Sequence, residues 1–167
     1  MQSLTGSMDQ GILMQVLWNC LRGHSFESML SSQLSTNIIC SGELPALGYH
    51  LLGQHFTPIL ALGIPLVGLL GKWALPMLQV VVITAAGLVL HRLAQQQLKP
   101  DLAAMVAIAF YGANAVIAPC MLSNFTDLSQ LPLCVFLLLL GLERQQRWLT
   151  WAAALAIPLI REDTGVV

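Results

Sequence analysis

Long apolar runs separated by short polar segments dominate this chain of 167 residues. Residues 73–91 and 102–126 contain no Asp, Glu, Lys or Arg. A membrane-spanning helix needs about 20 mostly apolar residues to cross roughly 30 Å of hydrocarbon. The pattern therefore predicts transmembrane helices over 75–94 and 102–122. Two shorter apolar runs predict further transmembrane helices over 128–142 and 148–167.

Residues 1–50 are more polar and predict an interfacial amphipathic helix followed by an outer loop. Asp9 is placed to cap a helix over 9–22, and Gly23 is placed to end it. The helix has an apolar stripe formed by Ile12, Val16, Leu17, Cys20 and Leu21. Its length and polarity suit a helix that lies in the membrane interface. Residues 24–50 are rich in Ser, Gln, Thr, Asn and Gly and predict a polar loop with little regular structure.

Residues 51–71 are apolar, but Pro58, Pro65 and four glycines interrupt them. Proline removes a backbone donor and breaks or kinks a helix, so the segment is predicted to be either one kinked crossing or a broken, re-entrant segment.

The basic residues orient the predicted spans. Arg92 and Lys99 flank one short loop, and Arg144 and Arg147 lie in another, two helices further on. Cytoplasmic loops are enriched in Lys and Arg, so both loops are expected on the cytoplasmic side. Asp127 and the far end of the last helix are then outside. The loop over 9–50 lies on the same outer side as Asp127 only if residues 51–71 make no net crossing of the membrane.

Composition supports a membrane protein. The chain is 56% hydrophobic and 9% charged, whereas a soluble domain carries about 25% charged residues. A net charge of −1 leaves no basic face for nucleic acid, which we exclude as a partner. The four cysteines have no zinc-site spacing. We therefore expect an all-α, polytopic transmembrane helix bundle that forms a single membrane domain over 1–167, with the lipid bilayer as its partner. Its polar start, and its stop just after a cluster of charges, suggest a fragment of a longer protein.

A few ionisable residues are candidates for chemistry. Arg161, Glu162 and Asp163 follow an apolar run that is about 20 Å long as a helix, which places three charges at or just inside the far interface. Such residues usually face a cavity or a partner, although a self-neutralising helix end is the alternative. Asp9 and Asp127 are candidate bases or ligands, and for both the alternative is helix capping. His55 opens an apolar segment and is a candidate substrate contact or a structural histidine.

Four motifs follow one another along the chain. They are Asp9-Gln10-Gly11-Ile12, Gln15-Val16-Leu17-Trp18-Asn19, Gly53-Gln54-His55-Phe56-Thr57-Pro58 and Arg161-Glu162-Asp163. This ordered set resembles the predicted membrane proteins of domain-of-unknown-function family 2079. The resemblance covers the whole chain, as the N-terminal part of longer family members without their first span.

The family is similar to polytopic glycosyltransferases of the GT-C architecture, which take sugars from polyprenyl-phosphate donors. The resemblance implies inverting sugar transfer with Asp9 as the catalytic base, in a multi-pass protein of the bacterial plasma membrane. It implies that His55 and Asp127 orient the sugar or a metal, and that Arg161, with Glu162 and Asp163 beside it, or a divalent metal stabilises the departing phosphate. The family's usual Phe-His pair is Phe125-Thr126 here, with Asp127 as a partial substitute.

Two other functions remain open. The chain is alternatively a transporter or proton-relay protein in which the charged residues line an ion path, or a non-catalytic membrane remnant. A transporter would have paired broken helices in two related halves, and the sequence has one broken segment and no repeat.

Overall fold

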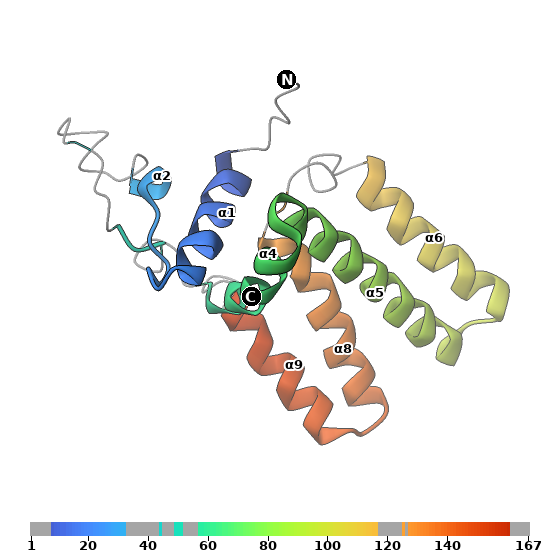
Figure 1. Ribbon diagram of the computed structural model, residues 1–167. Coiled ribbons are helices and arrows are strands. Elements are labelled where there is room, and N and C mark those ends of the chain that lie inside the picture. The colour runs from blue at the N-terminus through green and yellow to red at the C-terminus, as the bar shows by residue number, and fades with distance from the viewer. Residues whose placement is uncertain are drawn as a thin grey trace. The chain divides into compact units, whose positions relative to one another are not determined.

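The computed structural model describes residues 8–32, 44, 49–51, 57–116, 125 and 127–160, without the side chains of 8, 9 and 114–116 (Figure 1). Every regular element in these ranges is a helix, and the pairing of Glu27 with His50 is an isolated β-bridge. The predicted all-α class is therefore confirmed for this part of the chain. The chain divides into two compact units, residues 1–75 and 76–167, and each is described by itself.

The first unit is built on α1 (Met8–Leu21), which packs on α4 (Ile64–Leu70) and α2 (Met29–Ser32). Of the predicted stripe, Ile12, Val16 and Leu17 are buried, Cys20 is half-buried and Leu21 is exposed. Leu21 lies over Gly68 of α4 and leaves the rest of its surface open, while Leu13 takes a place in the core instead. The predicted apolar face of α1 is thus confirmed, except at its C-terminal end, where Leu21 is exposed.

Gly23 ends α1 as predicted. Its φ of 87° is left-handed, a conformation that glycine adopts without the cost a side chain adds. The Gly23 N–H donates to the Cys20 carbonyl at 3.2 Å, and the His24 N–H donates to the Asn19 carbonyl at 3.0 Å. These two bonds form a Schellman motif, which satisfies the last carbonyls of the helix.

The segment from 51 to 71 is described from Thr57 onward, apart from Leu51, and consists of short helical pieces. These are η2 (Pro58–Gly63), α4 and η3 (Gly71–Trp73). Gly71 has φ 52° and ψ −128°, so the backbone turns sharply where α4 ends. Pro58 and Pro65 each stand in the first turn of a helical piece, where a missing N–H is tolerated.

The second unit contains two helix pairs. Figure 1 shows α5 (Ala74–Gln97) beside α6 (Pro100–Val116), and α8 (Leu131–Glu143) beside α9 (Arg147–Ile160). The 3-10 helix η4 (Asp127–Gln130) leads directly into α8. Within the described residues, helices therefore lie where the apolar runs predicted them, and the predicted helix ends over 117–122 and 161–167 lie outside the described residues.

A contact at a glycine joins the two helices of each pair. The Tyr111 hydroxyl of α6 donates to the Thr84 carbonyl of α5 at 2.8 Å, and its ring lies over Gly87. A β-carbon on Gly141 of α8 would be 2.8 Å from the Thr150 backbone nitrogen of α9. The α8–α9 pair therefore depends on a glycine at its contact, as tightly packed membrane helices often do.

Membrane-crossing length is reached once in the described ranges. The helical stretch Pro58–Gln97 is long and apolar enough to cross a bilayer, by length and composition. Pro100–Ala113 and Arg147–Ile160 are apolar but shorter, at about 21 Å each against roughly 30 Å of hydrocarbon. A membrane-length segment is thus found, and the polytopic bundle over a single domain stays a prediction.

The outward faces of the second unit are apolar. Exposed side chains on α5, α6 and α9 include Met77, Val80, Val81, Leu88, Met105, Ile108, Trp148, Trp151 and Leu155. Water-soluble proteins rarely expose contiguous apolar surface on this scale, so these faces fit contact with lipid.

Candidate functional site

Asp127 is the candidate site residue whose side chain the structure describes. It is the first residue of η4 and half-buried, and its Oδ1 accepts a hydrogen bond from the Leu128 N–H at 2.9 Å. A carboxylate that accepts a backbone N–H at the start of a helical turn stabilises that turn. This bond goes to the next residue, whereas an N-cap accepts from the N–H two or three residues on, so both roles that the sequence offered for Asp127 stay predictions.

The elements around Asp127 form one end of the second unit, which we call the η4 end. It comprises η4 and the C-terminal end of α9, which packs on η4. Ile160, the last residue of α9, is fully buried, and Ser129 of η4 is almost fully buried. The Ser129 hydroxyl has no hydrogen-bond partner among the described residues.

The opposite end carries the two short loops, and we call it the loop end. Gln97 Nε2, at the end of α5, donates to Glu143 Oε1, at the end of α8, at 3.0 Å. The C-terminal ends of these two helices therefore meet, and both connections to the next helices lie on the same side. Four exposed basic residues belong to this region, namely Arg92, Lys99, Arg144 and Arg147.

A second Schellman motif makes the tight turn at the loop end. The Gln145 N–H donates to the Leu142 carbonyl at 3.2 Å, and the Gln146 N–H donates to the Gly141 carbonyl at 2.9 Å. Gln145 has φ 56°, so a non-glycine residue takes the left-handed position. Three residues suffice to reverse the chain between α8 and α9.

Gln79 of α5 was not selected from the sequence. Its side chain is 3% exposed, and neither its amide oxygen nor its amide nitrogen has a partner among the described residues. Buried polar groups are almost always hydrogen-bonded, so an orphaned amide needs an explanation. The signal was present in the sequence, because Gln79 is a polar side chain within the charge-free run 73–91.

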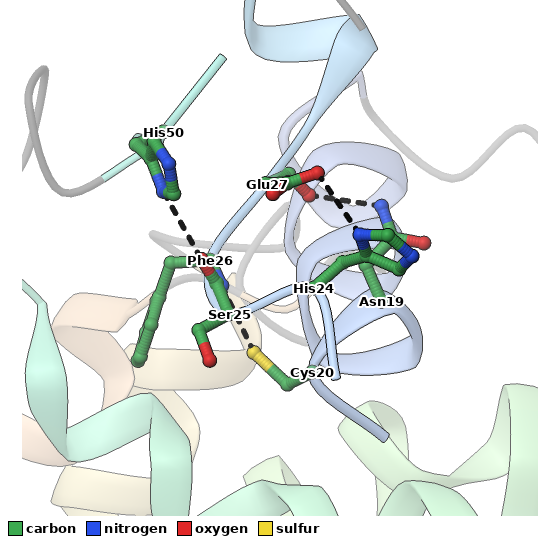
Figure 2. Close-up of polar contacts among 7 residues, drawn as sticks. All are labelled: Asn19, Cys20, His24, Ser25, Phe26, Glu27 and His50. Atoms are coloured by element: carbon green, nitrogen blue, oxygen red, sulfur yellow. Dashed lines mark hydrogen bonds and ion pairs between the residues drawn. The ribbon is translucent and has the colours of Figure 1, made fainter. Parts of the chain in front are cut away.

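The polar residues of the first unit fasten a loop to α1 (Figure 2). Asn19 Nδ2 donates to the Glu27 carbonyl at 2.9 Å, and the Phe26 N–H donates to Cys20 Sγ at 3.2 Å. Figure 2 shows His24 Nδ1 beside Glu27 Oε2, at 3.4 Å, and His50 on the other side of the loop, bonded to the Ser25 carbonyl at 3.1 Å.

This cluster is structural in its geometry. The two imidazoles bind separate partners and do not converge. Across the described ranges, no group of three His, Cys, Asp or Glu side chains is arranged to hold a metal ion. Residues 24–50 are predicted as a polar loop with little regular structure. In its described part, Asn19 and Gln15 of α1 bind residues 27, 28 and 30, and residues 29–32 form the short helix α2.

The other predicted site residues are described only in part. Asp9 is the second residue of α1, so the helix begins one residue before it and Asp9 lies in the first turn rather than preceding it. The capping role and the catalytic role of Asp9 both stay predictions. His55, Arg161, Glu162 and Asp163 lie outside the described residues, and their roles stay predictions.

Comparison with known proteins places the chain in a family. A family model described as Predicted membrane protein (DUF2079) matches residues 1–167. No curated protein and no solved structure matches the chain. The match confirms the resemblance found in the ordered motifs, and the membrane-length stretch Pro58–Gln97 agrees with the family's description. The chain therefore belongs to DUF2079, a family of predicted membrane proteins.

Proposed function

We propose that this protein is a multi-pass membrane glycosyltransferase that takes its sugar from a polyprenyl-phosphate donor. In the proposed orientation the loop end of the second unit faces the cytoplasm and the η4 end faces outward, in a bacterial plasma membrane. Four of the seven Lys and Arg residues belong to the loop end, which supports this orientation.

One observation carries the proposal. Asp127 and the end of α9 belong to the same end of the second unit, opposite the basic loops. Arg161, Glu162 and Asp163 follow Ile160 directly in the sequence. An acidic residue and a mixed-charge cluster are thereby assigned to the end where a lipid-linked sugar would present its headgroup. Ionisable residues at this depth mark ligand sites more often than anchors.

The proposed reaction is a single displacement at the anomeric carbon. The acceptor hydroxyl oxygen forms a bond to that carbon while the bond from the carbon to the phosphate oxygen breaks. The hydroxyl proton moves to the Asp9 carboxylate, a role that comes from the family resemblance. The lipid phosphate leaves with the electron pair, and the Arg161 guanidinium stabilises its charge through paired hydrogen bonds.

Either the Arg161 guanidinium or a divalent metal would stabilise the phosphate charge in this scheme, while Asp127 and His55 orient the sugar or the metal. Among the described residues, no group of three His, Cys, Asp or Glu side chains is arranged to hold a metal ion, and the side chains of Asp9, His55, Glu162 and Asp163 lie outside them.

Donor cleavage in native membranes tests the proposal. Membranes that contain the protein would be given radiolabelled polyprenyl-phosphate monosaccharides, and release of the unlabelled lipid phosphate and transfer of the label would be measured. We expect Asp9→Asn to slow transfer by roughly 100-fold or more, which is the usual contribution of a general base. Arg161→Gln should also slow sugar transfer.

Asp101→Asn is the matched control, because Asp101 is an exposed acid near the loop end. It should transfer sugar at the wild-type rate. Full activity of Asp9→Asn would show that another group is the base. If no donor is cleaved by wild-type membranes, the glycosyltransferase function is wrong and the remnant interpretation takes its place.

A further inference from the structure

A groove between α5 and α8 lies at the loop end of the second unit. It holds about 710 Å³, and most of the side chains that line it are apolar. On each helix these side chains belong to a single face, so two apolar stripes border a space that neither helix fills. The stripes include Leu90, Leu93 and Ala94 of α5 and Phe136, Leu139 and Leu142 of α8.

The length of the groove matches one leaflet of a bilayer. Its lining extends about 12 Å along the helix axis, from Leu90 to Leu98, which directly follows α5. One leaflet contributes about 15 Å of hydrocarbon, half of the roughly 30 Å total. Apolar cavities stay dry, so water is a poor occupant. The groove therefore has the polarity and depth that suit a lipid acyl chain.

The polar end of the groove is formed by Gln97 and Glu143, which also line it. Gln97 Nε2 donates to Glu143 Oε1 at 3.0 Å. The Gln96 amide nitrogen, in the amide orientation that pairs donor with acceptor, donates to Glu143 Oε2 at 2.6 Å. Both oxygens of the Glu143 carboxylate thus have amide donors from the protein itself. The carboxylate therefore needs no cationic group from a ligand.

Unpaired positive charge adjoins this polar end. Lys99 follows the lining residue Leu98, and Arg144 follows Glu143. Both basic side chains are exposed, and neither has an ion-pair partner among the described residues. Guanidinium and ammonium groups bind phosphate oxygens, and basic pockets between membrane helices bind anionic headgroups. An apolar groove with free cations at one end is complementary to an anionic phospholipid.

We propose that the groove binds one anionic phospholipid, with an acyl chain between the two apolar stripes and its phosphate on Arg144 and Lys99. The site lies at the opposite end of the second unit from Asp127, so it does not depend on the proposed sugar transfer. The proposed orientation assigns the lipid to the cytoplasmic leaflet, but binding itself does not require that orientation.

Native mass spectrometry tests the headgroup part of the site. The full chain, purified in a neutral detergent, would be titrated with phosphatidylglycerol or with phosphatidylcholine of the same acyl chains. We expect one phosphatidylglycerol to bind at least fivefold more tightly than phosphatidylcholine. Arg144→Gln should weaken phosphatidylglycerol binding by about fivefold, the factor that one basic residue near an anionic headgroup contributes. Arg22→Gln is the matched control, because Arg22 is an exposed cation of the first unit.

A larger side chain tests the acyl-chain part of the site. Ala94 lines the groove, so Ala94→Phe would fill part of the space and should weaken the binding of both lipids by at least tenfold. Ala109→Phe is the matched control, because Ala109 is exposed on α6 and does not line the groove. It should bind both lipids as the wild type does.

Several results would overturn the proposal. Equal affinity for the two lipids would remove the anionic headgroup, and displacement of phosphatidylglycerol by millimolar inorganic phosphate would show an anion site without a groove for the chain. Unchanged lipid binding by Ala94→Phe would show that the lipid lies elsewhere. A dimer without bound lipid would show that a second copy of the chain covers the groove.

A thermal measurement covers poor folding of the phenylalanine variant. A ligand that binds only the folded protein raises its unfolding temperature. Saturating phosphatidylglycerol should therefore raise the unfolding temperature of the wild type and of Arg22→Gln more than that of Arg144→Gln. The changed residue in each variant is exposed, so neither substitution disturbs the core. An equal rise in all three proteins, or none, would contradict the proposed site.

Discussion

Gly141→Ala is the substitution whose effect follows most directly from the structure. A methyl group on Gly141 would lie 2.8 Å from the Thr150 backbone nitrogen, 2.8 Å from its Oγ1 and 3.2 Å from its Cα. A rotamer change can move the hydroxyl but not the backbone of α9. The two helices must therefore separate. The substitution also lies at the turn, because the Gly141 carbonyl accepts the Gln146 N–H that closes it.

The expected magnitude has two opposing parts. Alanine in place of glycine within a helix gains about 1 kcal/mol of stability. Overpacking costs about 1–3 kcal/mol, and the upper value applies because backbone atoms are in the way. The net loss is about 2 kcal/mol. For a chain of this size that corresponds to a fall of roughly 4–8 °C in the unfolding temperature.

Gly112→Ala is the matched control. Gly112 is exposed within α6, and a methyl group there would meet nothing within 4 Å. The same change should therefore raise the unfolding temperature by roughly 2–4 °C, through helix propensity alone. Thermal unfolding of the detergent-purified protein, followed by circular dichroism, measures both. A Gly141→Ala protein that is as stable as Gly112→Ala would refute the close approach of α8 and α9.

Three further substitutions test other contacts. Tyr111→Phe removes the hydrogen bond to the Thr84 carbonyl and should lower the free energy of unfolding by about 1 kcal/mol, measured by urea titration in detergent. Gln15→Ala removes the acceptor of the Leu30 N–H and should speed limited proteolysis between α1 and α2, whereas an unchanged cleavage rate would contradict the anchoring role. Gly23→Ala should destabilise the end of α1 by about 1 kcal/mol, seen as faster amide exchange in its last turn, because φ is 87°.

Local patterns were sufficient to predict the helices. The charge-free runs marked α5 and α6, and Gly23 marked the end of α1, because these features depend on neighbouring residues in sequence. The pairing of the two short loops at one end followed from basic residues two helices apart. The hydrogen bond between Gln97 and Glu143 agrees with that arrangement.

Contacts between distant residues were not predictable in the same way. Gln15 and Asn19 were assigned only to a resemblance motif, yet their side chains bind the loop after α1. The hydrophobic period shows which face of a helix is apolar, but it does not show which polar side chain meets a backbone group far along the chain. The burial of Gln79 and the contact of Gly141 with Thr150 depend on such tertiary packing for the same reason.

The candidate site was predicted less completely than the fold. Asp127 was identified with both of its possible roles, and the structure shows that its carboxylate accepts the Leu128 N–H at the start of η4. The roles of Asp9, His55 and Arg161 come from motif order, which carries no geometry.

The three-residue turn between α8 and α9 bears on how the chain enters the bilayer. Each helix, at about 20 Å, is shorter than the hydrocarbon thickness and would be a weak stop for the insertion machinery alone. In the proposed multi-pass arrangement, a connection this brief would make the two helices a helical hairpin that is released into lipid as one piece. Arg144 and Arg147 at its tip would resist translocation, keep the tip on the cytoplasmic side and so give the hairpin its direction.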